Sequence, residues 1–167
     1  IKDFNYITII ASSGKLSIRQ EEGLSNAIAG FRPENKGQTK GIIALHGATV
    51  LSSDSGNYNR MIGARFLTHP PMGEEIPVHI ETPKHLITKD VSDFSITDEL
   101  YLMENLSEFD VLLSTEYNEF NRPLAWIKPY GSGKIFYCAL GHSSEQLSHP
   151  SVKKIIENAM KWLADFP

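Results

Sequence analysis

The segment GIIALHGA at residues 41–48 is an apolar run that leads directly into a histidine and a glycine. A short run without charged residues is typical of a strand that is buried on both faces of a sheet. The small residues after the histidine allow the chain to leave the strand through a tight turn. The segment therefore predicts a central strand over 41–45, with His46 at its carboxyl end.

The residues upstream complete a β-α-β unit. YITIIA at 6–11 is a second buried strand, and SIRQ at 17–20 has the S-x-x-Q form of a helix capping box. Apolar residues at helical spacing predict a helix from Ser17 to Phe31, which Pro33 and Gly37 should end. Two strands joined in this way are parallel by default, with a right-handed crossover.

The downstream pattern adds antiparallel strands and two more helices. We expect a short helix over 58–66, strands and loops over 69–106, a strand over 110–115, a hairpin that pairs 124–127 with 135–140, and a helix over 150–166. No linker or repeat divides the chain. The sequence thus predicts one α/β domain over 1–167, parallel at its centre with an antiparallel hairpin.

Composition excludes several classes of protein. The chain has 167 residues, of which 41% are hydrophobic and 22% are charged, so it is neither disordered nor collagen-like. Its net charge of −4 is spread along the chain, which gives no driving force for binding nucleic acid. No apolar run is long enough to span a bilayer, and the single cysteine, Cys138, cannot form an internal disulfide. We expect a soluble, cytoplasmic protein that binds neither membranes nor nucleic acid.

Two histidines follow predicted strands, His46 after GIIAL and His142 after IFYCALG. Ligands in open α/β sheets collect at the carboxyl ends of strands, where loops and helix N-termini converge. A single histidine at such a place is usually structural and bonded to the backbone. Two at strand ends favour a shared site.

Further polar residues from the middle region can join this edge of the sheet. His69 precedes two prolines, and Asp98 and Glu99 precede a tyrosine. Imidazoles and carboxylates are ligands for zinc and similar divalent metals, although no H-x-x-x-H or H-E-x-x-H spacing is present. A solvated turn is the alternative explanation for the acidic pair. The candidate metal ligands are His46, His69 and His142.

Other side chains suggest less. Tyr58 and Tyr101 lie near the expected edge and could stack on a sugar. Cys138 falls within a strand and is expected to be a small buried residue rather than a nucleophile. The glycine-bracketed stretch 131–134 is expected to be a hairpin turn rather than a phosphate loop.

Several longer motifs resemble the ThuA-like, or trehalose-utilisation, domains. The matching stretches are GIIALHGA (41–48), YNRMIGARFLTHPP (58–71), HLIT (85–88), FSITDELY (94–101) and RPLAWIKPYGSGKIFYCALGH (122–142). The resemblance implies a flavodoxin-like three-layer sandwich, similar to class I glutamine amidotransferases, with a mostly parallel central sheet and an antiparallel hairpin. His46 stands where those enzymes have their elbow cysteine, so glutamine amidotransfer is not expected.

The resemblance also implies a role with carbohydrate, either trehalose or a related disaccharide or its 3-keto derivative. The residues expected to catalyse proton transfer are His46, His142 and Glu99, and those expected to bind substrate are His69, Asp98, Tyr58 and Tyr101. The alternative is a sugar-binding or protein-binding module without catalysis.

Family members usually begin with a further strand, helix and strand that have no counterpart in this chain. We therefore also expect either a homo-oligomer or a severed N-terminal segment to cover the first strand.

Overall fold

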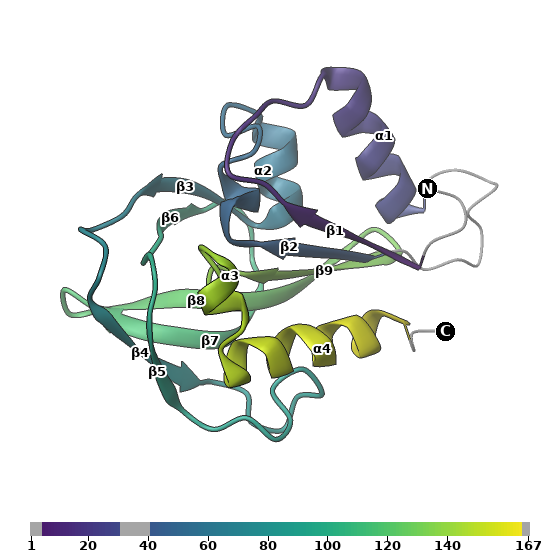
Figure 1. Ribbon diagram of the computed structural model, residues 1–167. Coiled ribbons are helices and arrows are strands. Elements are labelled where there is room, and N and C mark those ends of the chain that lie inside the picture. The colour runs from purple at the N-terminus through teal and green to yellow at the C-terminus, as the bar shows by residue number, and fades with distance from the viewer. Residues whose placement is uncertain (1–4, 31–40, 165–167) are drawn as a thin grey trace.

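A computed structural model describes residues 5–30 and 41–164 of the chain (Figure 1). Its elements, in chain order, are β1 (Tyr6–Ile10), α1 (Ile18–Ala29), β2 (Gly41–Leu45), the 3-10 helix η2 (His46–Thr49), α2 (Gly56–Ile62), β3 (Ala64–Thr68), β4 (Glu75–Ile80), β5 (Phe94–Thr97), β6 (Leu102–Asn105), β7 (Asp110–Tyr117), β8 (Phe120–Tyr130), β9 (Gly133–Cys138), α3 (Ser144–Leu147) and α4 (Pro150–Ala164).

The described strands form a seven-stranded sheet in the order β1-β2-β9-β8-β7-β4-β5, and β3 pairs with β6 in a separate two-stranded sheet. The predicted parallel pairing of β1 with β2 is confirmed, and β2 also runs parallel to β9. Helices α1 and α2 cover one face of this parallel part, and α4 covers the other (Figure 1). The carboxyl ends of β2 and β9 therefore meet at one edge.

The remaining pairings of the large sheet differ from the expectation of a mostly parallel sheet. All four of them, from β9 across to β5, are antiparallel, so the fold is a mixed α/β fold. Short turns explain two of these pairings, β7 with β8 and β8 with β9, because adjacent strands joined by a tight turn must run in opposite directions. Asn118 and Glu119 join β7 to β8 with φ values of 51° and 65°, the conformation that a two-residue hairpin turn requires.

The helix predicted over 58–66 is wrong in its second half. Helix α2 ends at Ile62, and Gly63 follows with a φ of 116°, a left-handed conformation that stops a helix. The next residues form β3, which pairs antiparallel with β6. Pairing between segments far apart in sequence has thus overridden the local apolar spacing, which is helical up to Phe66.

The first helix begins as predicted. The Ser17 side chain accepts a hydrogen bond from the backbone N–H of Gln20, and the Gln20 side chain completes the capping box. The chain leaves α1 at Gly30, whereas the stops predicted at Pro33 and Gly37 lie outside the described residues. The predicted hairpin of β8 and β9 and the final helix are both confirmed, the helix as far as Ala164.

Strand β1 forms one end of the large sheet, and among the described strands it pairs with β2 alone. Its last residue, Ile10, is 66% exposed. That a second polypeptide covers this strand stays a prediction. No helix within the described ranges has the length and apolar character needed to cross a bilayer.

Candidate functional site

His46 begins η2 directly after β2 and has a φ of 41°, which is unusual for any residue except glycine. Its backbone carbonyl accepts a hydrogen bond of 2.9 Å from the hydroxyl of Tyr137. The next residue must be small, because a Cβ on Gly47 would lie 1.8 Å from the carbonyl oxygen of Ala11. The sharp turn and these contacts direct the His46 ring towards the end of the neighbouring strand β9.

The protonation of the His46 ring follows from its neighbours. Its Nδ1 atom lies 2.6 Å from the carbonyl oxygen of Ala139, which can only accept a hydrogen bond, so Nδ1 carries a proton. Its Nε2 atom lies 3.0 Å from Oε2 of Glu99. In the neutral ring Nε2 presents a lone pair to that oxygen, which is repulsive unless a proton or a cation lies between them.

His142 reaches the same carboxylate from the loop after β9. Its Nδ1 atom lies 2.9 Å from Oε2 of Glu99 and 3.2 Å from Nε2 of His46. The convergence expected for the two histidines is thus present. His46 and Glu99 are buried, whereas the His142 side chain is 42% exposed. The cluster therefore opens to solvent on the His142 side.

The three ligand atoms form a triangle with sides of 2.9 to 3.2 Å. Around a tetrahedral zinc ion, nitrogen and oxygen ligands lie about 2.0–2.1 Å from the metal and so about 3.3 Å from one another. Small outward movements of the side chains would give that spacing. Two histidines and one glutamate are a ligand set that catalytic zinc sites use with a fourth position open. The donor atoms and the geometry both fit a divalent cation.

His69 contacts the other oxygen of the same carboxylate. Its Nε2 atom lies 3.0 Å from Oε1 of Glu99, and its Nδ1 atom lies 2.8 Å from the carbonyl oxygen of Pro70. The carbonyl fixes the proton on Nδ1, as at His46. His46 and His142 both contact Oε2, so His69 is the one imidazole of the three that contacts Oε1. Its side chain is 39% exposed and can exchange protons with solvent.

Tyr101 packs against the inner side of the cluster. Its ring centroid lies 4.2 Å from that of His46, and Phe66 packs on the tyrosine at 4.5 Å. Burial, together with the negative charges of Glu99 and Asp98, raises the pKa of the Tyr101 hydroxyl. The hydroxyl therefore remains protonated and can donate a hydrogen bond.

Asp98 lies beside the cluster and is buried. Its carboxylate accepts hydrogen bonds from the backbone N–H groups of Glu99 (2.8 Å), Gly141 (2.7 Å) and His142 (3.2 Å). It thus joins the two segments that carry Glu99 and His142.

Tyr58 differs from the expectation that it would lie at the edge of the sheet and stack on a sugar. Its side chain is 1% exposed, and its hydroxyl donates to the carbonyl oxygen of Ala48. The residue belongs to the core because α2 presents its apolar side to the sheet. Sequence patterns also missed the carbonyls of Ala139 and Pro70, since every residue has a carbonyl and only the fold selects these two.

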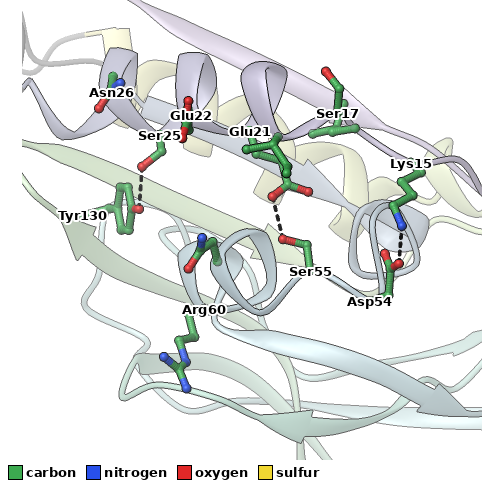
Figure 2. Close-up of a pocket in the computed structure, with 13 residues that line it drawn as sticks. Lys15, Ser17, Glu21, Glu22, Ser25, Asn26, Asp54, Ser55, Arg60 and Tyr130 are labelled. Carbon is green, nitrogen blue, oxygen red and sulfur yellow. Dashed lines mark hydrogen bonds and ion pairs between the residues drawn. The ribbon is translucent and has the colours of Figure 1, made fainter.

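A separate cavity of about 780 Å³ lies between α1 and α2, away from the cluster (Figure 2). Its polar side chains largely pair with one another: Lys15 with Asp54, Glu21 with Ser55, and Ser25 with Tyr130 (Figure 2). No histidine lines it. The chemically reactive groups converge at the histidine cluster rather than in this cavity.

The fold and the site together define an α/β protein with a histidine and carboxylate cluster at the carboxyl ends of parallel strands. The chain belongs to the ThuA (trehalose utilisation) family, whose model matches residues 16–163. No curated protein matches the sequence.

Solved structures share the fold at low sequence identity. A ThuA-like protein from Parabacteroides merdae superposes with a TM-score of 0.81 at 14% identity, over 97% of this chain and 71% of that one. A ThuA-like protein from Bacteroides uniformis gives 0.76 at 16% identity, over 97% and 70%. A β-galactosidase from Bacillus circulans gives 0.67 at 10% identity, over 95% of this chain and 22% of that one.

Proposed function

We propose that this protein acts on a carbohydrate at a divalent metal centre formed by His46, Glu99 and His142. The observation that carries the metal centre is the triangle of ligand atoms with sides of 2.9 to 3.2 Å, in which the Ala139 carbonyl leaves Nε2 of His46 free to bind a cation. Hydrogen bonds of this kind to the second ring nitrogen are the usual support of metal-binding histidines.

Charge supports the same proposal. Asp98 and Glu99 are adjacent carboxylates with exposures of 4% and 8%. Over the described residues, no lysine or arginine forms an ion pair with either of them, and the groups around Glu99 are imidazoles. Buried anions need compensating positive charge. A divalent cation supplies that charge while the two histidine ligands, His46 and His142, stay neutral.

The proposed class of substrate is supported by the family to which the chain belongs, whose description is trehalose utilisation. We propose a disaccharide such as trehalose or its 3-keto derivative. A keto group makes the hydrogen on the neighbouring carbon acidic, which suits a site rich in neutral imidazoles. A bound cation would polarise the carbonyl oxygen of the keto group and so make that hydrogen more acidic.

His69 is the residue that we propose moves the proton. It accepts the proton at Nε2, which can then donate a hydrogen bond to Oε1 of Glu99 at 3.0 Å, and returns the proton from there, while its Nδ1–H stays bonded to the carbonyl of Pro70. Tyr101 keeps the His46 ring in place and excludes water from its buried face. Proton transfer of this kind leads to an isomerised or epimerised sugar, or prepares it for loss of a substituent.

Metal binding is tested first. The chelator-treated protein is titrated with Zn²⁺ in a calorimeter, and the metal content of untreated protein is measured by mass spectrometry. We expect one ion per chain. A chain that binds neither Zn²⁺, Mn²⁺ nor Co²⁺ would contradict the proposed centre.

The reaction is tested by exchange with solvent. The metal-loaded protein is incubated with 3-keto-trehalose in D₂O, and proton NMR follows deuterium incorporation next to the carbonyl. Trehalose itself, which lacks that acidic hydrogen, is the matched control. Exchange no faster than in buffer would contradict proton transfer.

A second candidate function is a sugar-binding or protein-binding module without catalysis. The observation in its favour is that the same fold makes up 22% of a β-galactosidase chain, where it is one part of a larger protein. Saturation-transfer NMR with trehalose and its keto derivative separates the two candidates. A module binds the sugar without exchanging its hydrogens, whereas an enzyme does both.

A further inference from the structure

Asp98 is an unusual residue for its position, because its side chain is buried and yet the described residues provide it with no ion-pair partner. Three backbone N–H groups satisfy the carboxylate instead. Oδ1 accepts from Glu99 and His142, and Oδ2 accepts from Gly141. A carboxylate has about four acceptor sites, so the backbone uses most of them.

Those hydrogen bonds connect two distant segments of the chain. Glu99 is the neighbour of Asp98, whereas Gly141 and His142 are 43 and 44 residues further along. Both segments carry a residue of the ligand triangle. A carboxylate that accepts N–H groups from both fixes the distance between the backbones of Glu99 and His142. Hydrogen bonds to an ionised acceptor are stronger than neutral ones, so this connection is stiff.

Gly141 shows how closely the loop is held. Its φ is 114°, and a Cβ at this position would lie 2.6 Å from the Leu147 side chain. The loop thus turns sharply between β9 and α3, with its N–H groups directed at Asp98. A second hydrogen bond, from the Gln146 side chain of α3 to the Thr97 carbonyl at 3.0 Å, joins the same two segments at the surface.

We infer that Asp98 is a positioning residue, which sets the spacing of Glu99 and His142 for the metal and does not bind substrate. This inference rests on the proposed metal centre. We propose this positioning role for Asp98 in place of the substrate-binding role that the sequence suggests, because its carboxylate accepts hydrogen bonds from backbone N–H groups. Removing it should leave all three ligands present but wrongly spaced.

The test compares Asp98→Asn with the wild-type protein, using Co²⁺ as the probe. Asn keeps the shape of Asp but replaces one acceptor oxygen with an NH₂ group, which faces a backbone N–H and cannot accept from it. Loss of an outer-shell partner typically weakens metal binding about 10–100-fold. We expect that loss of Co²⁺ affinity, together with a changed visible absorption spectrum of bound Co²⁺, which reports ligand geometry.

Asp93→Asn is the matched control. Asp93 also accepts a backbone N–H, from Ile80 at 2.9 Å, and contacts His79, but it lies in the exposed loop before β5. We expect Co²⁺ affinity within about twofold of wild type, since no metal ligand depends on this residue. If Asp98→Asn also binds Co²⁺ within that range and with an unchanged spectrum, the inference is wrong.

Circular dichroism shows whether Asp98→Asn folds. If it does not, Asp98→Glu decides, because it keeps the carboxylate but moves the acceptor oxygens by one methylene group, so that Gly141 and His142 are held at a different distance from Glu99. We expect Co²⁺ affinity to fall about tenfold, with a changed absorption spectrum. Unchanged affinity and an unchanged spectrum in a folded Asp98→Glu variant would overturn the inference.

Failure of the metal centre itself is a separate outcome. If the wild-type protein binds no Co²⁺, imidazole ¹⁵N NMR of the metal-free protein still tests the positioning role. In that case the His142 and His46 signals should shift in Asp98→Asn, while those of the remote His79 stay in place. Unshifted signals would contradict the role of Asp98, whereas shifted signals would support it even though the proposed metal centre had failed.

Discussion

Nε2 of His46 lies 3.2 Å from Nδ1 of His142, although the two residues are 96 positions apart in the sequence. They meet because β2 and β9 are parallel neighbours in which Leu45 pairs with Cys138. His46 directly follows β2 and His142 lies in the loop after β9, and the Glu99 carboxylate closes the triangle from the segment between β5 and β6. This relationship leads to predictions about the metal and about the fold that holds it.

Replacing His46 by alanine should abolish measurable zinc binding. The variant loses one of the three ligands. Loss of a residue that only hydrogen-bonds to a ligand typically lowers metal affinity about 10–100-fold, and loss of the ligand itself should lower it further. Calorimetric titration with Zn²⁺ gives the affinity. His79→Ala is the control, since this exposed histidine contacts Asp93 and lies outside the cluster. Equal zinc affinity in the two variants would contradict a ligand role for His46.

Replacing His69 by alanine should separate metal binding from catalysis. Its Nε2 atom contacts Oε1 of Glu99, whereas the ligand triangle uses Oε2. We expect zinc affinity to fall by no more than the about 10–100-fold that is typical when a hydrogen-bond partner of a ligand is removed, and so by less than in His46→Ala. Deuterium exchange into the keto sugar should slow about 10²–10⁴-fold, as for loss of a general base. A loss of zinc affinity as large as that of His46→Ala would show that His69 is itself a ligand.

Gly47→Ala should destabilise the protein strongly. The added Cβ would lie 1.8 Å from the Ala11 carbonyl oxygen, and backbone atoms cannot move aside cheaply. We expect a loss of about 3 kcal/mol in the free energy of unfolding, measured by urea denaturation. Gly23→Ala is the matched control, because no atom lies within 4 Å of its added Cβ. Gly23 lies inside α1, so this variant should gain up to about 1 kcal/mol. A Gly47→Ala variant as stable as wild type would mean that the turn after His46 is not as tight as described.

Cys138 should be unreactive in the folded protein and should make stability fall at high pH. Burial raises the pKa of its thiol from 9.0 to about 12. Below pH 9 the thiol is neutral in both states, and as pH rises from 9 to 12 only the unfolded chain ionises, so the stabilising contribution is lost across that range. Between about pH 8 and about pH 10.5 the wild type should lose about 2 kcal/mol more than Cys138→Ala.

Urea denaturation of both proteins at the two pH values checks this prediction, and labelling with a thiol reagent checks reactivity. Equal pH dependence in the two proteins would contradict it. Rapid labelling of the folded wild type would show that the thiol is accessible.

Local patterns in the sequence predicted much of the parallel part of the fold. The run at 41–45 could only be a buried strand, because it lacks any polar residue to place on an exposed face. The S-x-x-Q pattern at 17–20 specified a helix start through contacts within four residues. Where the deciding partner was distant, local reading was wrong, as at Phe66, which lies in β3 because of its pairing with β6.

The candidate site divides in the same way. The sequence by itself determined that His46 and His142 follow strands and that His69, Asp98 and Glu99 belong to the middle region of strands and loops over 69–106, since these facts follow from short-range patterns. Only the tertiary structure decided that one carboxylate contacts three imidazoles, and that the carbonyls of Ala139 and Pro70 set which ring nitrogens face it. It also placed Tyr58 in the core and directed Asp98 at the backbone. The reason is physical: the direction of a side chain and the state of its protons depend on neighbours that the packing of distant segments brings within about 3 Å.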